Sequence, residues 1–404
     1  MSVKPEQSTY PVNRLIIVGN GFDLAHNLKT RYSDFLDYFW RTFCDTLDHP
    51  FISLNIPEEC KMRMQCYSSL EDICKEFALR LNTQFYDSGG GQINFKGTSF
   101  SITFLNYFFL TLCREQALEN WVDFEIAYYR KLKALARDAK SPEKNIATRI
   151  RILNRDVEAI LFEFSEYLRR IIPEGNIANN ISAMCKLFDN PYLDESQEGN
   201  FLREFSAKNL RKHNIRREES LHNMPCQAFR DTLILNFNYT PTVKTYLHRS
   251  DYANVVHIHG DIYDSNNTPI LGFGDENDDD YKLLENLNNN DFLKLIKSVH
   301  YPRSANYKKL FDFIDSDAFQ VQLMGHSCAL SDRTLLQSIF EHDNCASVKI
   351  FYHKKQRPLP NEDADDFSFL VRNISRHFSD KKMMRDKLVN KEYCSILPQN
   401  NSWG

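Results

Sequence analysis

Short apolar segments that end in glycine or polar residues are the sequence feature that most restricts the fold of this chain. Five of them are rich in β-branched residues and are apolar at consecutive positions, at residues 15–18, 232–237, 254–258, 319–324 and 348–352. Continuous apolarity is typical of strands that helices cover on both faces, as in a parallel sheet. Helical patterns separate the later segments, at 241–249, 281–296, 305–314 and 331–342. This alternation predicts an α/β fold with a Rossmann-like parallel sheet.

A long segment between the first two predicted strands departs from the alternation. It has helical patterns at 60–85, 120–137 and 146–172, with aromatic residues at core-facing spacing, and shows no convincing strand. We therefore expect a large helical insertion after the first strand, packed over the carboxyl edge of the sheet. The predicted organisation is an N-terminal tail (1–13), a Rossmann-like core (14–29 and 229–360), the helical insertion (30–228) and a C-terminal helical tail (361–404).

Composition restricts the classes of function. The 404 residues have a formal net charge of −4 and a pI of about 6.3, which argues against a nucleic-acid-binding protein with a strongly basic surface. The longest apolar stretch is too short to span a bilayer and the N-terminus has no apolar signal core, so we expect a cytoplasmic protein without a membrane partner. The ten cysteines include no CxxC pair, so we expect no zinc.

The first motif with chemical content is LIIVGNGFD, at residues 15–23. Glycines in a turn after a strand let a ligand approach the backbone amides, and the start of the following helix attracts phosphate. By itself the motif is a weak signal, because a tight turn without a ligand uses the same glycines. The candidate binding residues in this turn are Gly19, Asn20, Gly21, Phe22 and Asp23.

Three further motifs follow later strands in the same way. They contribute Asn238 in LILNFNYT, His259 in VVHIHGD, and Gly325, His326 and Ser327 in LMGHSCALSD. Because the carboxyl ends of parallel strands meet at one edge of a sheet, the four motifs together predict a single ligand-binding crevice.

Two other features suggest metal binding only weakly. His257 and His259 flank one isoleucine and are expected to share a face, but no further histidine or cysteine follows with ligand spacing, so we expect no metal site. The acidic run at 275–280 (DENDDD) is interpreted as a solvated loop, with a weak cation site as the alternative.

Several of these blocks occur together in a known family. GNGFDLAH, WVDFE, NFNYT, HIHG and GHSxxxSD, in this order, resemble the AbiH family of bacterial abortive-infection, antiphage proteins, from about residue 14 to 353. That family is in turn similar to the sirtuin-like Rossmann proteins. The resemblance implies an antiphage effector, and it leaves open a homo-oligomer and a trigger from the phage or from a partner protein.

The sirtuin-like resemblance implies a site for NAD. The turn at 19–23 stands where those proteins surround the dinucleotide, and the turn at 325–327 stands on the adenosine side. Asn238 stands at the asparagine that handles the nicotinamide ribose and a water, and His259 at the catalytic histidine. Thr240 replaces the usual aspartate, Asp23 replaces a serine, and the zinc-binding cysteine pairs are absent. The missing zinc module argues against protein deacylation and leaves NAD hydrolysis.

The resulting hypothesis is an NAD glycohydrolase that needs no cofactor beyond NAD as its substrate. Asn238 would orient water or a ribose hydroxyl, and His259 would act as general base. Asp123 and Glu125, in WVDFE, are candidate supporting residues. Either Asp23 or Glu125 would place negative charge near the developing cation. The alternatives are a non-catalytic nucleotide sensor that triggers a partner protein and, less favoured, a defence nuclease.

Overall fold

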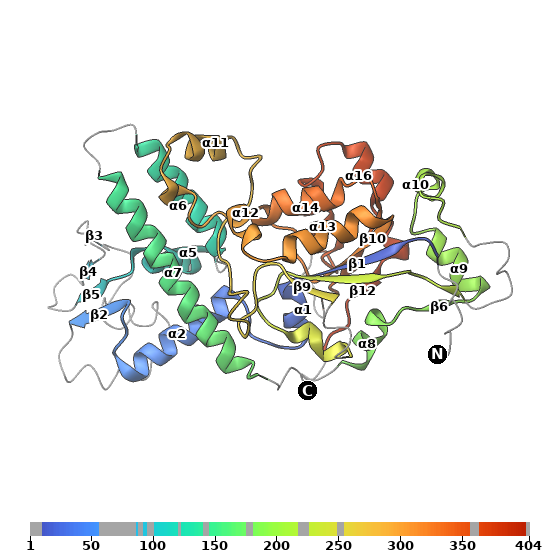
Figure 1. Ribbon diagram of the computed structural model, residues 1–404. Helices are drawn as coiled ribbons and strands as arrows, with labels where there is room; N and C mark the ends of the chain where they lie inside the picture. The colour runs from blue at the N-terminus through green and yellow to red at the C-terminus, as the bar shows by residue number, and fades with distance from the viewer. Residues whose placement is uncertain are drawn as a thin grey trace.

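A six-stranded parallel sheet forms the centre of one lobe of the protein (Figure 1). The strands are ordered β12-β11-β10-β1-β8-β9, and every neighbouring pair is parallel. Counted within this sheet, the order is 6-5-4-1-2-3, which is the doubly wound Rossmann order read from the other edge. The bounds are β1 (Asn13–Val18), β8 (Thr232–Asn236), β9 (Val255–His257), β10 (Phe319–Met324), β11 (Cys345–Tyr352) and β12 (Ser395–Ile396). The predicted Rossmann-like parallel sheet is therefore confirmed.

The computed structural model describes most of the chain. The described residues are 10–55, 86–87, 92–94, 101–119, 123–139, 145–174, 181–216, 226–248, 254–355 and 363–400. The predicted helix at 60–85 and the glycine tract at 89–91 lie outside them. None of the described helices is long and apolar enough to cross a membrane.

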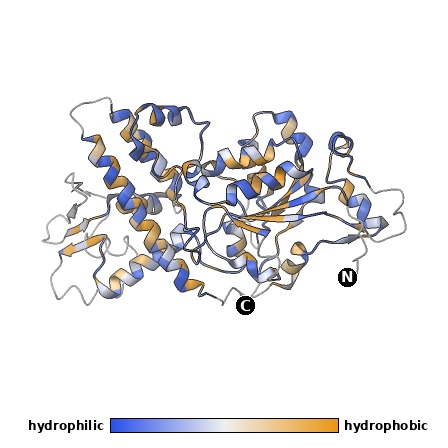
Figure 2. Ribbon diagram, viewed as in Figure 1, coloured by the Kyte–Doolittle hydropathy of each residue, from blue (hydrophilic) through white to orange (hydrophobic). Residues whose placement is uncertain are grey.

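Helices cover both faces of the sheet, which explains the continuous apolarity of its strands. Leu15 and Ile17 of β1 pack in a hydrophobic cluster with α13, α14 and α15, whereas Ile16 and Val18 pack in another with α1, α8 and the 3₁₀ turn η2. Hydrophobic residues accordingly run along the strands of the sheet (Figure 2). The bounds are α1 (Asn20–Ala25), α8 (Ser182–Phe188), η2 (Thr242–Tyr246), α13 (Asn306–Ser316), α14 (Arg333–Phe340) and α15 (Phe367–Ser375).

The second lobe is built mainly from the insertion (Figure 1). The aromatic residues of its helices meet in one core, where Tyr32 stacks on Phe124 at 4.1 Å between ring centroids and Phe39 packs on Phe109 at 4.3 Å. These aromatic residues therefore form a core, as their helical spacing predicts. The helices are α2 (Tyr32–Thr46), α5 (Tyr107–Glu119), α6 (Phe124–Asp138) and α7 (Ile146–Ile171).

The insertion also contains strands, which the sequence analysis did not predict. A small antiparallel sheet has the order β2-β5-β4-β3, and β6 pairs with β7. Strands of two to four residues are too short to show alternation, and distant partners hold them in place. Their bounds are β2 (Ile52–Asn55), β3 (Tyr86–Asp87), β4 (Gln92–Asn94), β5 (Ser101–Phe104), β6 (Tyr192–Leu193) and β7 (Cys226–Gln227).

A later stretch of chain, residues 262–296, packs with the insertion. Leu271, Phe273 and Phe292 belong to the same hydrophobic cluster as α6 and α7, so the two lobes are joined by packing as well as by chain connections. The helix predicted at 281–296 is broken into α11 (Asp279–Asn286) and the 3₁₀ turn η4 (Asn290–Phe292), because Asn288 takes a left-handed conformation (φ 48°) and Asn289 caps the turn.

The remaining elements surround the sheet. The segment after residue 360, predicted as a helical tail, also supplies the edge strand β12. The bounds are α9 (Glu195–Leu202), α10 (Ala207–Lys212), α12 (Lys297–His300), η5 (Tyr301–Arg303), η6 (Leu330–Asp332), α16 (Lys381–Lys387) and η7 (Lys391–Tyr393).

Candidate functional site

A pocket of about 950 Å³ opens at the carboxyl ends of the central strands. It lies where the strand order reverses, at β1 and β10, which is where open α/β sheets bind their ligands. Phe164 of α7 also lines it, so the insertion forms part of its wall. The sequence-predicted residues that line the pocket are Gly19, Asn20, Gly21, Asp23, Asp123, Glu125, Asn238, His259, Gly325, His326 and Ser327.

Phe22 is the one candidate that does not line the pocket. Its fully buried ring lies against His26, Phe188 and Tyr246, with centroids 4.9, 5.9 and 5.8 Å away. The Phe22 ring therefore packs in the hydrophobic core next to the sheet, because its position on α1 directs it there, and a binding role of this residue stays a prediction.

Each of the two turns needs glycine because the backbone of the other turn packs directly against it. The Gly21 amide donates to the Gly325 carbonyl oxygen at 2.8 Å, and a Cβ atom on Gly21 would lie 2.8 Å from that same oxygen. A Cβ atom on Gly19 would lie 2.5 Å from the Cα atom of His326. Gly325 has φ +73°, a conformation that L side chains rarely adopt. The two turns thus pack backbone against backbone, and this packing demands glycine whether or not a ligand approaches.

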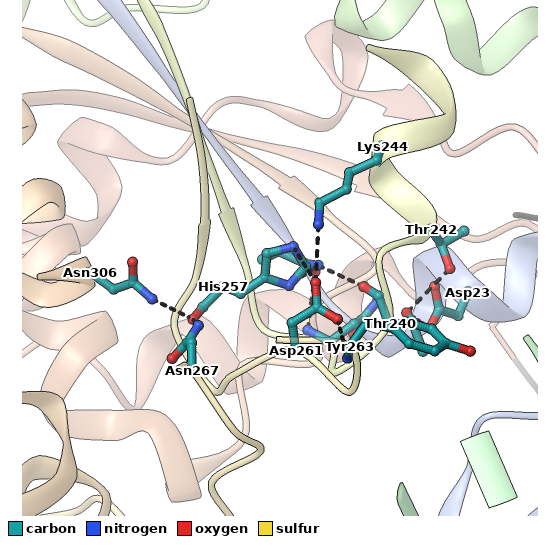
Figure 3. Close-up of polar contacts among 11 residues, drawn as sticks. Asp23, Thr240, Thr242, Lys244, His257, Asp261, Tyr263, Asn267 and Asn306 are labelled. Atoms are coloured by element: carbon teal, nitrogen blue, oxygen red, sulfur yellow. Dashed lines mark hydrogen bonds and ion pairs between the residues drawn. The ribbon is translucent and has the colours of Figure 1, made fainter. Parts of the chain in front are cut away.

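Asp23 and Thr240, which come from different strand ends, are hydrogen-bonded to each other. The Thr240 hydroxyl donates to Asp23 Oδ2 at 2.6 Å, and Thr242 donates to Thr240 at 3.2 Å (Figure 3). Asp23 is almost fully buried, and its Oδ1 has no hydrogen-bond partner among the described residues. Burial raises the pKa of Asp23 to about 6, although the hydrogen bond from Thr240 opposes the rise. This hydrogen bond joins the first glycine turn to the segment that follows β8.

Asn238 is held by the first glycine turn and by Asn236. Its side-chain Nδ2 donates to the Gly19 carbonyl oxygen at 3.1 Å, and its backbone N–H donates to Asn236 Oδ1 at 3.1 Å. The amide nitrogen of Asn238 therefore has an internal role, and its amide oxygen is the group best placed to accept a hydrogen bond from a ligand.

A buried cluster of charges forms the wall beside His259. Lys297 is completely buried, and its Nζ lies 2.7 Å from both Glu125 Oε2 and Asp332 Oδ1. Asp332 Oδ1 also lies 3.2 Å from His259 Nε2, and Asp332 Oδ2 lies 3.6 Å from His326 Nε2. Burial opposes ionisation of Asp332, but the charge of Lys297 outweighs it and holds the pKa of Asp332 well below its usual value. Burial raises the pKa of Glu125 to about 7 in spite of Lys297.

His259 is neutral in this environment. Burial, and then the positive charge of Lys297, lower its pKa to about 4, with Asp332 opposing the shift. Because Nε2 faces the carboxylate, a proton on Nε2 is favoured, and Nδ1 is then the basic nitrogen. Phe237 fixes the ring from one side, with its centroid 5.0 Å away at an interplanar angle of 84°.

His257 and His259 do not share a face, contrary to expectation. β9 ends at His257 and the chain turns, so the alternation of a strand does not extend to His259. His257 lies 3.5 Å from Asp261, measured from Nε2 to Oδ2, and it does not line the pocket.

Sequence reasoning missed Lys297 altogether. The only local signal is a lysine within the apolar context of LKLIKSVH, which is also typical of a surface helix. Asp123 was taken as a supporting acid, and its carboxylate caps α6 by accepting from the amides of Glu125 and Ile126 at 3.0 Å each. Trp121, in the same block, lies outside the described residues.

The acidic run at 275–280 is solvated only in part, because Glu276, Asn277 and Asp279 are exposed whereas Asp275 is buried. Asp275 is buried with its Oδ2 3.3 Å from Arg333, Asp278 caps α11, and Asp280 pairs with Arg137 at 2.8 Å. Asp275, Asp278 and Asp280 therefore already have cationic or backbone partners. Across the described ranges, no group of three or more histidine, cysteine, aspartate or glutamate side chains has the geometry to hold a metal ion.

Comparison with known proteins agrees with the sequence motifs. A family model described as bacteriophage abortive infection AbiH matches residues 15–354, which include both glycine turns, Asn238, His259 and the charge cluster. No curated protein and no solved structure matches the chain significantly. Since the family model covers most of the chain, the protein belongs to the bacteriophage abortive infection AbiH family.

Proposed function

We propose that this AbiH protein binds NAD in the pocket and hydrolyses the bond between nicotinamide and ribose as the effector step of abortive infection. The observation that carries the proposal is the position of His259 and Asn238 beside the two glycine turns, at the switch point of a Rossmann-ordered sheet. The volume of about 950 Å³ is at the upper end of the usual range of ligand pockets and suits a dinucleotide.

The chemistry needs little acid catalysis, because nicotinamide in NAD carries a positive charge and leaves as a neutral molecule. The bond between the anomeric carbon and the pyridinium nitrogen breaks, and its electron pair stays with the nitrogen. Water oxygen bonds to the anomeric carbon through a transition state that resembles an oxocarbenium ion, and the water proton passes to a base. The products are nicotinamide, ADP-ribose and a proton.

His259 fits the role of that base. At neutral pH its imidazole is unprotonated and can accept the water proton, and the Asp332 carboxylate, 3.2 Å away, would stabilise the imidazolium that forms. A base with a pKa of about 4 is weak, but the carbon under attack is strongly electrophilic, so a weak base suffices. Asn238 would orient the water or a ribose hydroxyl through its amide oxygen.

The acidic residues around His259 favour a substrate that develops positive charge on the ribose. Glu125 and Asp123 line the pocket from the insertion, and Asp23 lines it from the core. Carboxylates placed where positive charge develops stabilise a transition state most when water is excluded. Burial of Glu125, with its pKa of about 7, means that its negative charge increases across the neutral range.

The deciding experiment is to incubate the purified protein with NAD and measure released nicotinamide, with and without Mg²⁺ and DNA. Release that is independent of Mg²⁺ supports the proposal. Binding of NAD without release would instead favour a nucleotide sensor that triggers a partner protein. Cleavage of DNA that depends on Mg²⁺, with NAD unchanged, would favour a nuclease.

A further inference from the structure

A second polar network surrounds His257, which does not line the pocket (Figure 3). It centres on Asn236, the last residue of β8, whose carboxamide makes three contacts. Its Oδ1 accepts from the Asn238 amide at 3.1 Å, and its Nδ2 donates to the Thr240 carbonyl oxygen at 3.0 Å and to His257 Nδ1 at 3.2 Å. The segment 236–240 is therefore folded around one buried side chain.

His257 accepts the second hydrogen of this carboxamide, whose orientation the Thr240 carbonyl oxygen and the Asn238 N–H also define. Because Asn236 Nδ2 donates, His257 Nδ1 must be the unprotonated nitrogen, and the ring proton is on Nε2, which faces Asp261 Oδ2 at 3.5 Å. Lys244 Nζ lies 3.1 Å from the same oxygen and compensates its charge. Reversing the carboxamide would oppose its oxygen to the Thr240 carbonyl and its NH₂ to the Asn238 N–H.

The backbone of His257 is held as firmly as its ring. Its carbonyl oxygen accepts from the side chains of Asn267 and Asn306 at 2.9 and 3.0 Å, and Asp261 Oδ1 accepts from the Tyr263 amide at 3.0 Å. The histidine thus reaches Asn236 from a rigid position. It has 7% of its surface exposed and does not line the pocket, so a bound ligand would not touch it.

The effect of the network reaches the pocket through the residues that follow Asn236. Asn238 Nδ2 donates to the Gly19 carbonyl oxygen and the Thr240 hydroxyl donates to Asp23 Oδ2, and these residues line the pocket. We propose that His257 is a positioning residue, which fixes the carboxamide of Asn236 through Nδ1 and thereby places Asn238 and Thr240 at the pocket. Its influence on turnover rests on the proposed function, whereas its influence on the 236–240 segment does not.

Two substitutions separate this role from simple packing. In His257→Asn, the amide oxygen occupies the place of Nδ1 and keeps an acceptor for Asn236. In His257→Gln, the amide extends to the place of Nε2, so it keeps a partner for Asp261 and leaves Asn236 without an acceptor. If His257 only packs or pairs with Asp261, glutamine should preserve the 236–240 segment better than asparagine does. If His257 positions Asn236, asparagine should preserve that segment better than glutamine does.

The experiment measures amide hydrogen exchange in peptides that cover 236–241 of the full chain, without ligand, for wild type and both variants. We expect exchange to rise about five- to tenfold in His257→Gln, the equivalent of one lost hydrogen bond, and to change less than about twofold in His257→Asn. His300→Gln is the matched control, because His300 is equally buried, lies outside the pocket and network, and should leave this exchange unchanged.

Nicotinamide release is the second measurement. The Gln variant should lower kcat about tenfold, because small misplacements of positioning groups are costly, and the Asn variant should retain it within about twofold. Wild-type protein that releases no nicotinamide would refute the proposed function and leave the exchange result decisive for His257. The positioning role is overturned if the Asn variant loses protection at 236–241, or if a folded Gln variant keeps it.

Discussion

At the scale of a single residue, burial changes the pKa of His259. A histidine in water has a pKa near 6.5, but burial and the neighbouring Lys297 lower the pKa of His259 to about 4. The residue type suggested a base tuned to neutral pH; its environment makes it a neutral imidazole over the whole physiological range. Asp23 is affected in the opposite direction, since burial favours the neutral form of a carboxyl group and raises its pKa.

Replacing His259 by alanine tests its role in the chemistry. If the protein hydrolyses NAD, His259→Ala should lower kcat by about a hundredfold to ten-thousandfold, the usual contribution of a positioned general base. NAD affinity should change little, because other residues supply most of the pocket wall. Nicotinamide release and titration calorimetry measure the two effects. Full turnover in the variant would rule out the mechanism while leaving the fold intact.

Asp23→Asn tests the cost of its buried charge. An aspartate in the unfolded chain ionises near pH 3.9, but in the folded protein Asp23 ionises near pH 6, so the folded state binds more protons between these values. The free energy of unfolding of the wild type should therefore fall by about 2–3 kcal/mol as pH rises from 4 to 6, and this part of the pH dependence should vanish in the variant.

Urea unfolding at several pH values measures this difference. Asp194→Asn is a control of opposite sign, because the N-cap hydrogen bonds of Asp194 from Ser196 and Gln197 lower its pKa. A wild-type and an Asp23→Asn stability profile that run parallel from pH 4 to 7 would contradict the prediction.

At the scale of elements, the pocket depends on how two turns meet. The turn between β1 and α1 and the turn after β10 come from opposite ends of the sequence, yet their backbones are in direct contact. Neither turn alone shows why its glycines are needed. The contact also explains why the pocket is preformed, since each turn restricts the conformation of the other.

Gly325→Ala should disrupt this contact. The new Cβ atom would lie 2.2 Å from the Phe22 amide nitrogen, and the residue has positive φ, so we expect a loss of about 2–4 kcal/mol in the free energy of unfolding and weaker nucleotide binding. Gly199→Ala is the matched control. No atom lies within 4 Å of a Cβ atom there, and the residue is inside α9, so alanine should stabilise the protein by up to about 1 kcal/mol. Equal effects at the two glycines would be inconsistent with the turn contact.

At the scale of the whole molecule, the charge cluster joins the two lobes. Glu125 belongs to α6 of the insertion, Lys297 to α12, and Asp332 to the turn η6 that follows β10 and precedes α14. The fully buried Lys297 contacts both carboxylates, so an ionic contact beside the pocket joins segments that pack in different cores. Shared packing at 262–296 adds to this connection.

Lys297→Met should separate the effects of charge and shape. Removing the lysine leaves two buried carboxylates close together without their cation, so we expect a loss of about 3–5 kcal/mol in the free energy of unfolding. The double variant Lys297→Met/Glu125→Gln removes one of these negative charges and should recover part of the loss. Denaturant unfolding of both variants checks this, and a double variant less stable than the single one would show that the ion pairs are not the cause.

Much of this architecture follows from local signals in the sequence. Continuous apolar runs predicted five of the six strands of the parallel sheet, because strands covered on both faces need apolar residues at every position. Glycine and polar residues directly after these runs predicted the edge at which the pocket lies, since all carboxyl ends of a parallel sheet point the same way. The aromatic core of the insertion likewise followed from helical spacing.

Other features were decided only by the tertiary structure. Lys297 joins the site because α12 packs against the insertion, Phe22 does not line the pocket because α1 directs the ring into the core, and His257 separates from His259 because the strand ends between them. The short strands β2 to β5 depend on one another in the same way. In each case the deciding interaction joins residues far apart along the chain or depends on where an element ends, and local sequence patterns carry no direct signal for either.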